Sequence, residues 1–313
     1  MILIDFNQQI VSSAHYLQKN NIEINVKTLQ HTFFKYIISR IHGINNSQIA
    51  RKHGKFSRTA HDIVICCDGR NYWRRDYFPY YKIKRAENRS KSTLDWGKIF
   101  ECVDEIKENI VKNTKIKLIN IDKVEADDII SILVKHFSGK ENICILSTDR
   151  DFVQLQVYDN VWQFSTITNE FIKPEISGVD SLIEKLIVGD KGDGVPNVLS
   201  SDDIFVQEKG RQTPIRKNKY EELYTAIKNK VTKSSTSYED LMIIEECSTN
   251  LNRNNKLMNL ITGIPQEITI SIINEYDKVK IFNEELDVFN CLNFIRNNKF
   301  NIEKQDEIYI IGS

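Results

Sequence analysis

The stretch VEADDIISILV, residues 124–134, places three carboxylates at the start of an apolar segment with helical spacing. Such a segment favours a helix that is buried against a sheet, and acids in its first turn suit the positive end of the helix dipole. Asp122 as the N-cap and Glu125 as the third residue of a capping box explain part of this charge. They do not explain why acids also follow other buried-looking runs of the chain.

Short apolar runs rich in β-formers lie on both sides of this stretch. They occupy residues 2–4, 63–67, 116–121, 143–147 and 161–164, and segments with helical spacing lie between them at 23–40, 96–111 and 125–137. Alternating strands and helices predict an α/β fold with a central, mostly parallel sheet flanked by helices. Because the strand runs are continuously apolar, we expect both faces of the sheet to be covered.

The strand signals fade from about residue 176. Helices are predicted instead at 179–188, 219–230, 238–246 and 268–276, and surface loops at the Asn-, Lys- and Ser-rich stretches 43–62 and 228–238. We therefore expect an α/β core of residues 1–175 and a helical, DNA-binding C-terminal region of residues 176–313.

The composition is that of a soluble globular protein, with 313 residues, 41% hydrophobic and 27% charged. Basic and acidic residues balance at 43 each, so binding to a polyanion requires an uneven distribution of charge. The six cysteines lack zinc-site spacing and are expected to be reduced. No run approaches the roughly 18 apolar residues of a membrane span, and no signal peptide is evident, which predicts a cytoplasmic protein without membrane contact.

Acidic residues follow several of the predicted strands directly. Asp5 follows the first run, Asp68 the second, and Asp149 and Asp151 the fourth. The carboxyl ends of parallel strands share one edge of a sheet, so these side chains are expected to meet there. The full candidate set for this edge, with the acids of the opening stretch and of the loop at 189–197, is Asp5, Asp68, Glu125, Asp127, Asp128, Asp149, Asp151, Asp190 and Asp193.

Each acid alone also has an ordinary explanation as a helix cap, a turn residue or part of a solvated loop. Together, however, carboxylates on one edge repel one another unless cations compensate them. Oxygen ligands without His or Cys select hard ions, which indicates Mg²⁺, with Mn²⁺ as a substitute. The sequence therefore predicts a site for two such ions, of the kind that hydrolyses phosphodiesters.

A basic and aromatic segment begins directly after Asp68. Residues 70–91 carry eight cations and six aromatic rings, which suit phosphates and unstacked bases respectively, although a solvated helix face with core aromatics is the plainer alternative. The nucleic-acid-binding candidates are Arg70, Tyr72, Trp73, Arg75, Tyr81, Lys84 and Arg89. A second cluster, Lys209, Arg211, Arg216 and Lys217, is a candidate for duplex backbone or is simply solvated.

Five motifs occur in order: LIDFNQ (3–8), CDGRNYWRRDYFPYYKIKR (67–85), VEADDII (124–130), STDRDFVQL (147–155) and GDKGDGVPN (189–197). Together they resemble the flap endonuclease / 5′-nuclease superfamily, which has a PIN-like core, and most of all its bacteriophage ribonuclease H type. The resemblance implies that all nine acids ligate two divalent metals. It also implies a helical arch or bridge over about residues 70–95, in which Arg74, Lys82 and Arg85 contact the scissile phosphate. Arg75 is a close alternative to Arg74.

The implied activity is that of a metal-dependent 5′→3′ exonuclease and flap endonuclease with ribonuclease H activity, which removes RNA primers and adjacent DNA during replication. The implied partners are RNA·DNA hybrids, 5′-flap and duplex DNA, a single-stranded-DNA-binding protein and a sliding clamp, with the protein itself a monomer. The second glycine pattern of the family's duplex-binding hairpin is missing after Asp193, so binding of a monovalent cation is not implied.

Three other functions are compatible with parts of the pattern. A PIN-like ribonuclease would share the acids but would not need the basic arch or the loop at 190–193. A non-catalytic binder of flaps or junctions would not need the complete acid set. A phosphatase-like hydrolase would account for the paired aspartates at 149–151, but not for the other acids or the basic segment.

Overall fold

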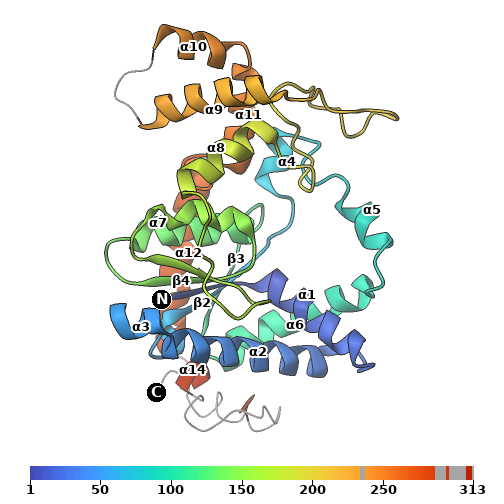
Figure 1. The fold of residues 1–313 in the computed structure, drawn as a ribbon. Helices are drawn as coiled ribbons and strands as arrows, with labels where there is room; N and C mark the ends of the chain where they lie inside the picture. The colour runs from blue at the N-terminus through green and yellow to red at the C-terminus, as the bar shows by residue number, and fades with distance from the viewer. Residues whose placement is uncertain (233–236, 286–293, 296–307, 312–313) are drawn as a thin grey trace.

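The computed structural model describes residues 1–232, 237–285, 294–295 and 308–311. At its centre lies a five-stranded sheet in the order β3-β2-β1-β4-β5, in which every neighbouring pair is parallel (Figure 1). The strands are β1 (Ile2–Asp5), β2 (Ile63–Cys67), β3 (Lys117–Asn120), β4 (Ile143–Leu146) and β5 (Val161–Phe164). All five predicted strands are thus confirmed. Register pairs Asp5 with Cys66 and Ile4 with Leu146, so the three central strands end level with one another.

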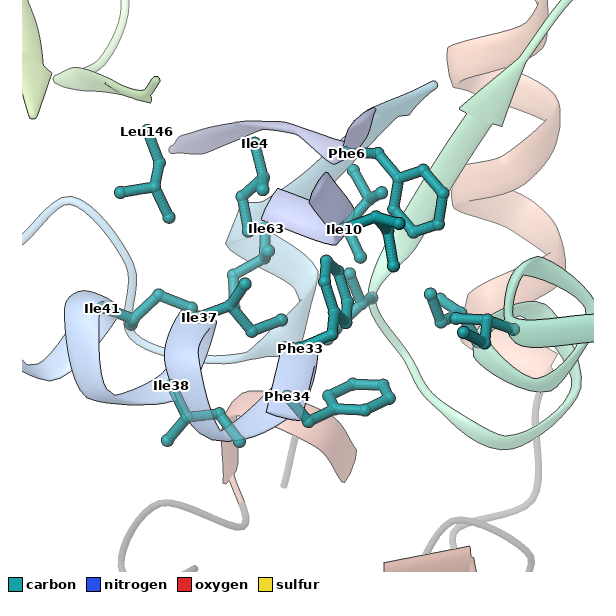
Figure 2. Close-up of a cluster of buried hydrophobic side chains, with 14 of the residues drawn as sticks. Ile4, Phe6, Ile10, Phe33, Phe34, Ile37, Ile38, Ile41, Ile63 and Leu146 are labelled. Carbon is teal, nitrogen blue, oxygen red and sulfur yellow. The ribbon is translucent and has the colours of Figure 1, made fainter. Parts of the chain in front are cut away.

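Helices cover both faces of the sheet, as the continuously apolar strands predict. One face packs against α1 (Phe6–Lys19), α2 (Val26–Asn46) and α6 (Trp96–Asn113). Figure 2 shows this core, where Phe6 meets Phe33 edge to face with ring centroids 5.4 Å apart. The opposite face packs against α7 (Ala126–Phe137), the 3₁₀ helix η2 (Arg150–Val157) and α12 (Gln266–Glu285).

The C-terminal helices form a smaller group with its own core. It contains α8 (Gly178–Val188), α9 (Lys217–Thr232), α10 (Tyr238–Glu245) and α11 (Ser248–Met258), at the top of Figure 1. The chain then returns to the sheet, because α12 adds Ile272 to one core and α14 (Ile308–Ile311) adds Ile310 to the other. The C-terminal region therefore also completes the α/β core.

The arch segment is helical only in part. It holds two short helices, α4 (Trp73–Tyr77) and α5 (Arg85–Ser90), and in Figure 1 it runs from beside the C-terminal helices down to α6. Its upper end is fixed by Phe78 and Tyr81, which pack against Leu257 and Met258 of α11.

The predicted loop at 43–62 is wrong in part. There α2 continues to Asn46, and α3 (Gln48–His53) and the short η1 (Ala60–Asp62) follow. Ser47 caps α3 by accepting the Ala50 N–H at 3.1 Å, and buried Phe56 ties the segment to the core. The other predicted loop, 228–238, is also wrong in part, because α9 continues to Thr232 and α10 begins at Tyr238; residues 233–236 lie outside the described part of the chain.

The start of α7 also differs from the prediction. The N-cap is Glu125 and not Asp122, and the Asp128 carboxylate accepts the Glu125 N–H at 3.2 Å. This shift by one turn places Asp127 and Asp128 in the first turn.

Five cysteines are buried free thiols, as expected, and Cys291 lies outside the described residues. Among the helices that the structure describes, none combines the length and apolar character needed to cross a membrane.

Candidate functional site

A cavity of about 1260 Å³ opens at the carboxyl end of the sheet. Four of the nine predicted acids line it: Asp5 at the end of β1, Asp68 after β2, Asp127 in the first turn of α7 and Asp149 after β4. The arch supplies another part of the wall, including Lys82 and Arg85. Acids that are far apart in sequence are thus brought together as the parallel sheet predicts.

Hydrogen bonds hold these carboxylates in place. Asp5 caps α1 by accepting the Gln8 N–H at 3.2 Å, and it also accepts the Ser147 hydroxyl at 3.2 Å. Asp68 accepts the Asn7 amide at 2.6 Å and the Ala126 N–H at 2.9 Å. The ordinary capping explanations therefore hold at Asp5 and do not conflict with a shared site.

The four cavity acids have no basic side chain paired with them among the described residues. Burial, followed by the charges of Asp68 and Asp149, raises the pKa of Asp5 to about 7. Burial and then Asp149 raise the pKa of Asp127 well above its usual value. A cation in the cavity would relieve this repulsion.

Oxygen donors and excess negative charge fit hard divalent ions. As the side chains stand, no three His, Cys, Asp or Glu residues in the described part of the chain form a group that could hold a metal. The fit thus rests on donor chemistry and charge, and not on a preformed coordination shell.

The raised pKa of Asp5 predicts a pH dependence of stability in the absence of metal. The unfolded chain releases this proton near pH 4 and the folded protein near pH 7, so the Asp5 contribution to the free energy of unfolding falls as pH rises between them. Asp5→Asn keeps an N-cap side chain and removes the charge. We expect this variant in EDTA to gain on the order of 2 kcal/mol relative to wild type between pH 5 and pH 8. Thermal unfolding of both proteins at pH 5 and at pH 8 measures this difference in stability. A difference that does not grow between pH 5 and pH 8 would contradict the prediction.

A second group of acids is buried beside the cavity and paired with Arg74. Its guanidinium contacts Glu125 and Asp128 at 2.7 Å each and donates through Nε to the Leu257 carbonyl at 2.8 Å. Trp73 Nε1 donates to Asp128 at 2.9 Å. Arg74 is only 2% exposed and Asp128 is fully buried. In this arrangement Arg74 does not line the cavity and Asp128 contacts Arg74, while the predicted phosphate contact of Arg74 and metal role of Asp128 stay predictions.

Lys82 joins this group to the loop at 190–193. Its ammonium pairs with Glu125 and lies 3.7 Å from Asp193, while Arg85 lies 3.2 Å from Asp193. Burial alone would raise the pKa of Glu125, but Lys82 and Arg74 outweigh it and lower that pKa. Lys82 has φ +55°, a conformation that is costly outside glycine, and its N–H donates to the Asp193 carbonyl at 2.7 Å.

Asp151 and Asp190 form a third group around Lys185. The Lys185 ammonium contacts both carboxylates, the second at 3.0 Å. Burial raises the pKa of Asp151 to about 6 although Lys185 opposes it. The nine acids are therefore not one cluster. They divide into Asp5, Asp68, Asp127 and Asp149 in the cavity, Glu125 and Asp128 with Arg74, Asp151 and Asp190 with Lys185, and Asp193 with the arch cations.

The predicted nucleic-acid-binding residues also divide by exposure. Trp73 and Tyr81 are 7% and 3% exposed; Tyr81 lines the cavity and Trp73 does not. Arg75 is exposed, lines the cavity and lies over the Tyr72 ring, 5.4 Å from its centroid. Arg75 is thus better placed for substrate than its neighbour Arg74.

The remaining cations lie on the surface. Arg70 is exposed in an ion pair with Asp104, Lys84 is exposed, and Arg89 is half-buried against the cavity. The second basic cluster is exposed to solvent. Its members lie on the connection from α8 to α9, which projects sideways in Figure 1, and at the start of α9; they are Lys209, Arg211, Arg216 and Lys217.

Sequence reasoning missed three side chains that shape the site. Asn7 anchors Asp68, Ser147 anchors Asp5, and Lys185 bridges Asp151 and Asp190. Asn7 and Ser147 stand within two residues of a predicted acid, which is a usable signal. Lys185 lies on a predicted helix with no pattern that marks it.

Comparisons with known proteins agree with the fold and the motifs. The family model described as "5'-3' exonuclease, N-terminal resolvase-like domain" matches residues 3–185, and "T4 RNase H, C terminal" matches residues 175–286. Ribonuclease H of Enterobacteria phage T4 is 31% identical over 284 residues, which cover 89% of this chain and 87% of that protein. A 5'-3' exonuclease of Mycoplasmopsis pulmonis is 26% identical over 207 residues, 63% of this chain and 61% of that protein.

Solved structures share the fold. The bacteriophage T5 5'-exonuclease with bound zinc ions has a TM-score of 0.57 at 17% identity, over 90% of this chain and 99% of that one. The T5 flap endonuclease in a complex with DNA and metal ions has a TM-score of 0.60 at 18% identity, over 90% and 98%. The resemblance found in the motifs is thereby confirmed, and the chain belongs to the 5′-3′ exonuclease family of nucleases, with a C-terminal region of the T4 ribonuclease H type.

Proposed function

We propose that this protein is a divalent-metal-dependent 5′→3′ exonuclease and flap endonuclease with ribonuclease H activity. Its substrates are RNA·DNA hybrids and duplex DNA with free 5′ ends or flaps, and its role is the removal of RNA primers and adjacent DNA in replication. The observation that carries the proposal is one cavity lined by four carboxylates without ion-pair partners and by cations of the arch. Family membership and the DNA complex of the T5 enzyme support the choice of substrate.

Two Mg²⁺ ions, or Mn²⁺ in their place, are the proposed cofactors. Asp5, Asp68, Asp127 and Asp149 would hold the first, and Asp151, Asp190 and Asp193 are candidates for the second. Such ions, when bound, would lower the pKa of a water molecule and neutralise negative charge on a phosphate. Asp190 does not line the cavity, and it pairs with Lys185. Binding of the second ion is therefore proposed to depend more on the presence of substrate than binding of the first.

The arch residues have distinct proposed roles. Lys82 and Arg85 line the cavity, where positive charge stabilises the charge that builds on phosphorus during displacement. Arg75 and Tyr72 face the same space and are assigned to the unpaired strand. Arg74 acts as a positioning residue, because it fixes Glu125 and Asp128 and reaches no solvent.

Residues 176–313 are proposed to hold the duplex through Lys209, Arg211, Arg216 and Lys217. Exposed cations on a projecting connection suit phosphate contacts, which release counterions and make affinity salt-dependent. Contacts with a single-stranded-DNA-binding protein and a sliding clamp, and the monomeric state, stay predictions from the sequence.

The proposal is tested by cleavage of a 5′-labelled RNA·DNA hybrid and a 5′-flap duplex, each with Mg²⁺ and with EDTA. We expect short 5′-labelled products from both substrates, in Mg²⁺ only, and their lengths distinguish exonuclease from flap cutting. Cutting of RNA without need for a free 5′ end would indicate a PIN-like ribonuclease instead. Binding without cleavage in every metal condition would indicate a non-catalytic flap binder.

A further inference from the structure

An aromatic pair on α6 lines the cavity away from the acids. The rings of Trp96 and Phe100 have centroids 5.8 Å apart, and both face the cavity. Phe100 is 47% exposed, so part of its ring is accessible from the cavity.

Arg89 from the end of α5 lies over both rings. Its guanidinium carbon is 5.3 Å from the centroid of Trp96 and 5.2 Å from that of Phe100. In the part of the chain that the structure describes, no carboxylate pairs with Arg89. A guanidinium held by ring faces keeps its N–H donors available for a phosphate.

Trp96 takes part through its ring. Its Nε1 is buried by protein atoms, so the N–H does not face a strand in the cavity. The ring instead lies beneath the Arg89 guanidinium and holds it beside Phe100.

The position along α6 relates this pair to the acids. Lys107 of the same helix lies 5.9 Å from the ring of Phe6, the residue after Asp5. Trp96 precedes Lys107 by 11 positions, which is roughly 16 Å along the helix axis. Stacked nucleotides at about 3.4 Å each would need around five to cover that distance.

We infer that Arg89, Trp96 and Phe100 form a stacking site for unpaired nucleotides of the 5′ strand, several nucleotides from the bond that is cut. Phe100 offers its exposed ring to a base, and the Arg89 guanidinium donates to oxygens of the strand. The inference rests on the proposed function, because it names where the 5′ strand of that substrate lies.

The test uses two substitutions at Phe100. Phe100→Ala removes the ring, and Phe100→Leu keeps apolar volume while it also removes the π face. Both variants are compared with wild type on a duplex with a ten-nucleotide 5′ flap and on the same duplex without unpaired 5′ nucleotides. We expect KM for the flap substrate to rise about tenfold in both variants, since stacking on an aromatic ring contributes that order of affinity per base. Values for the substrate without a flap should not change.

A binding measurement separates this inference from the proposed function. A flap carrying 2-aminopurine about five nucleotides from the junction is titrated with protein in EDTA, where its fluorescence falls if the base stacks. Wild type should quench the probe, and both variants should not. Quenching without any cleavage in Mg²⁺ would overturn the proposed function and leave the stacking site standing. Equal quenching by wild type and variants, or equal loss on both cleavage substrates, would overturn the stacking site.

Discussion

Replacement of Asp127 by Asn lowers kcat/KM for a 5′-flap duplex in Mg²⁺ by at least about a hundredfold, the scale of losing one charge-stabilising group at a reacting phosphate. Asp127 lines the cavity, and its pKa is raised well above the usual value by burial and by Asp149. Asn preserves its shape and removes the negative charge that a divalent ion requires. Because this charge is unfavourable in the metal-free fold, the variant stays folded, which circular dichroism and thermal unfolding verify.

Asp104→Asn is the matched control for this prediction. Asp104 lines the same cavity, but its side chain is 63% exposed and contacts Arg70 at 3.3 Å. Exposed ion pairs of this kind contribute little, so we expect less than about a threefold change. Similar losses in both variants would show a general effect of charge in the cavity, and an active Asp127→Asn would remove Asp127 from the site.

Replacement of Arg74 by Ala lowers the free energy of unfolding by about 3–5 kcal/mol, the range for breaking a buried ion pair on one side. The substitution leaves Glu125 and Asp128 buried without their shared cation, and it frees the Leu257 carbonyl on α11. The arch thereby loses one of its links to α7 and one to the C-terminal helices. Urea unfolding at constant pH measures the change through the transition midpoint.

Arg75→Ala separates structural from substrate roles at neighbouring positions. Arg75 is exposed, lies over Tyr72 and donates to the Tyr81 carbonyl at 3.2 Å, so its loss should change stability by no more than about 1 kcal/mol. Its effect should appear instead as a raised KM for flap substrates. A stable Arg74→Ala variant with an isolated loss of substrate affinity would reverse the assignment of the two arginines.

The positions of strands and acids along the chain could be predicted because they depend on local patterns. Continuous apolar runs identify buried parallel strands, and an acid directly after such a run must lie at the carboxyl edge of the sheet. Asp5, Asp68 and Asp149 were placed correctly for this reason. The prediction of a loop at 43–62 was wrong in part because it relied on the polar composition of this stretch. Helix-capping residues and a few buried side chains, such as Phe56, stabilise short helices there.

The pairing of charges could not be predicted in the same way. Adjacent residues on a helix point about 100° apart, and the sequence does not show which of Arg74 and Arg75 faces inward. The answer depends on Asp128 and on Leu257, which is 183 residues away in the chain. Lys185 likewise meets Asp151 only through the packing of α8 beside η2.

Binding of Mn²⁺ to wild type and to Asp127→Asn, measured by loss of the electron paramagnetic resonance signal of free Mn²⁺, tests the central claim most directly. The four cavity carboxylates are proposed to hold a divalent ion, so wild type should remove free Mn²⁺ from solution, and Mg²⁺ should compete. Asp127→Asn should bind at least tenfold more weakly, while Asp104→Asn should match wild type. Equal binding by all three proteins, or none by wild type in the presence of a 5′-flap duplex, would contradict a metal site at this edge of the sheet.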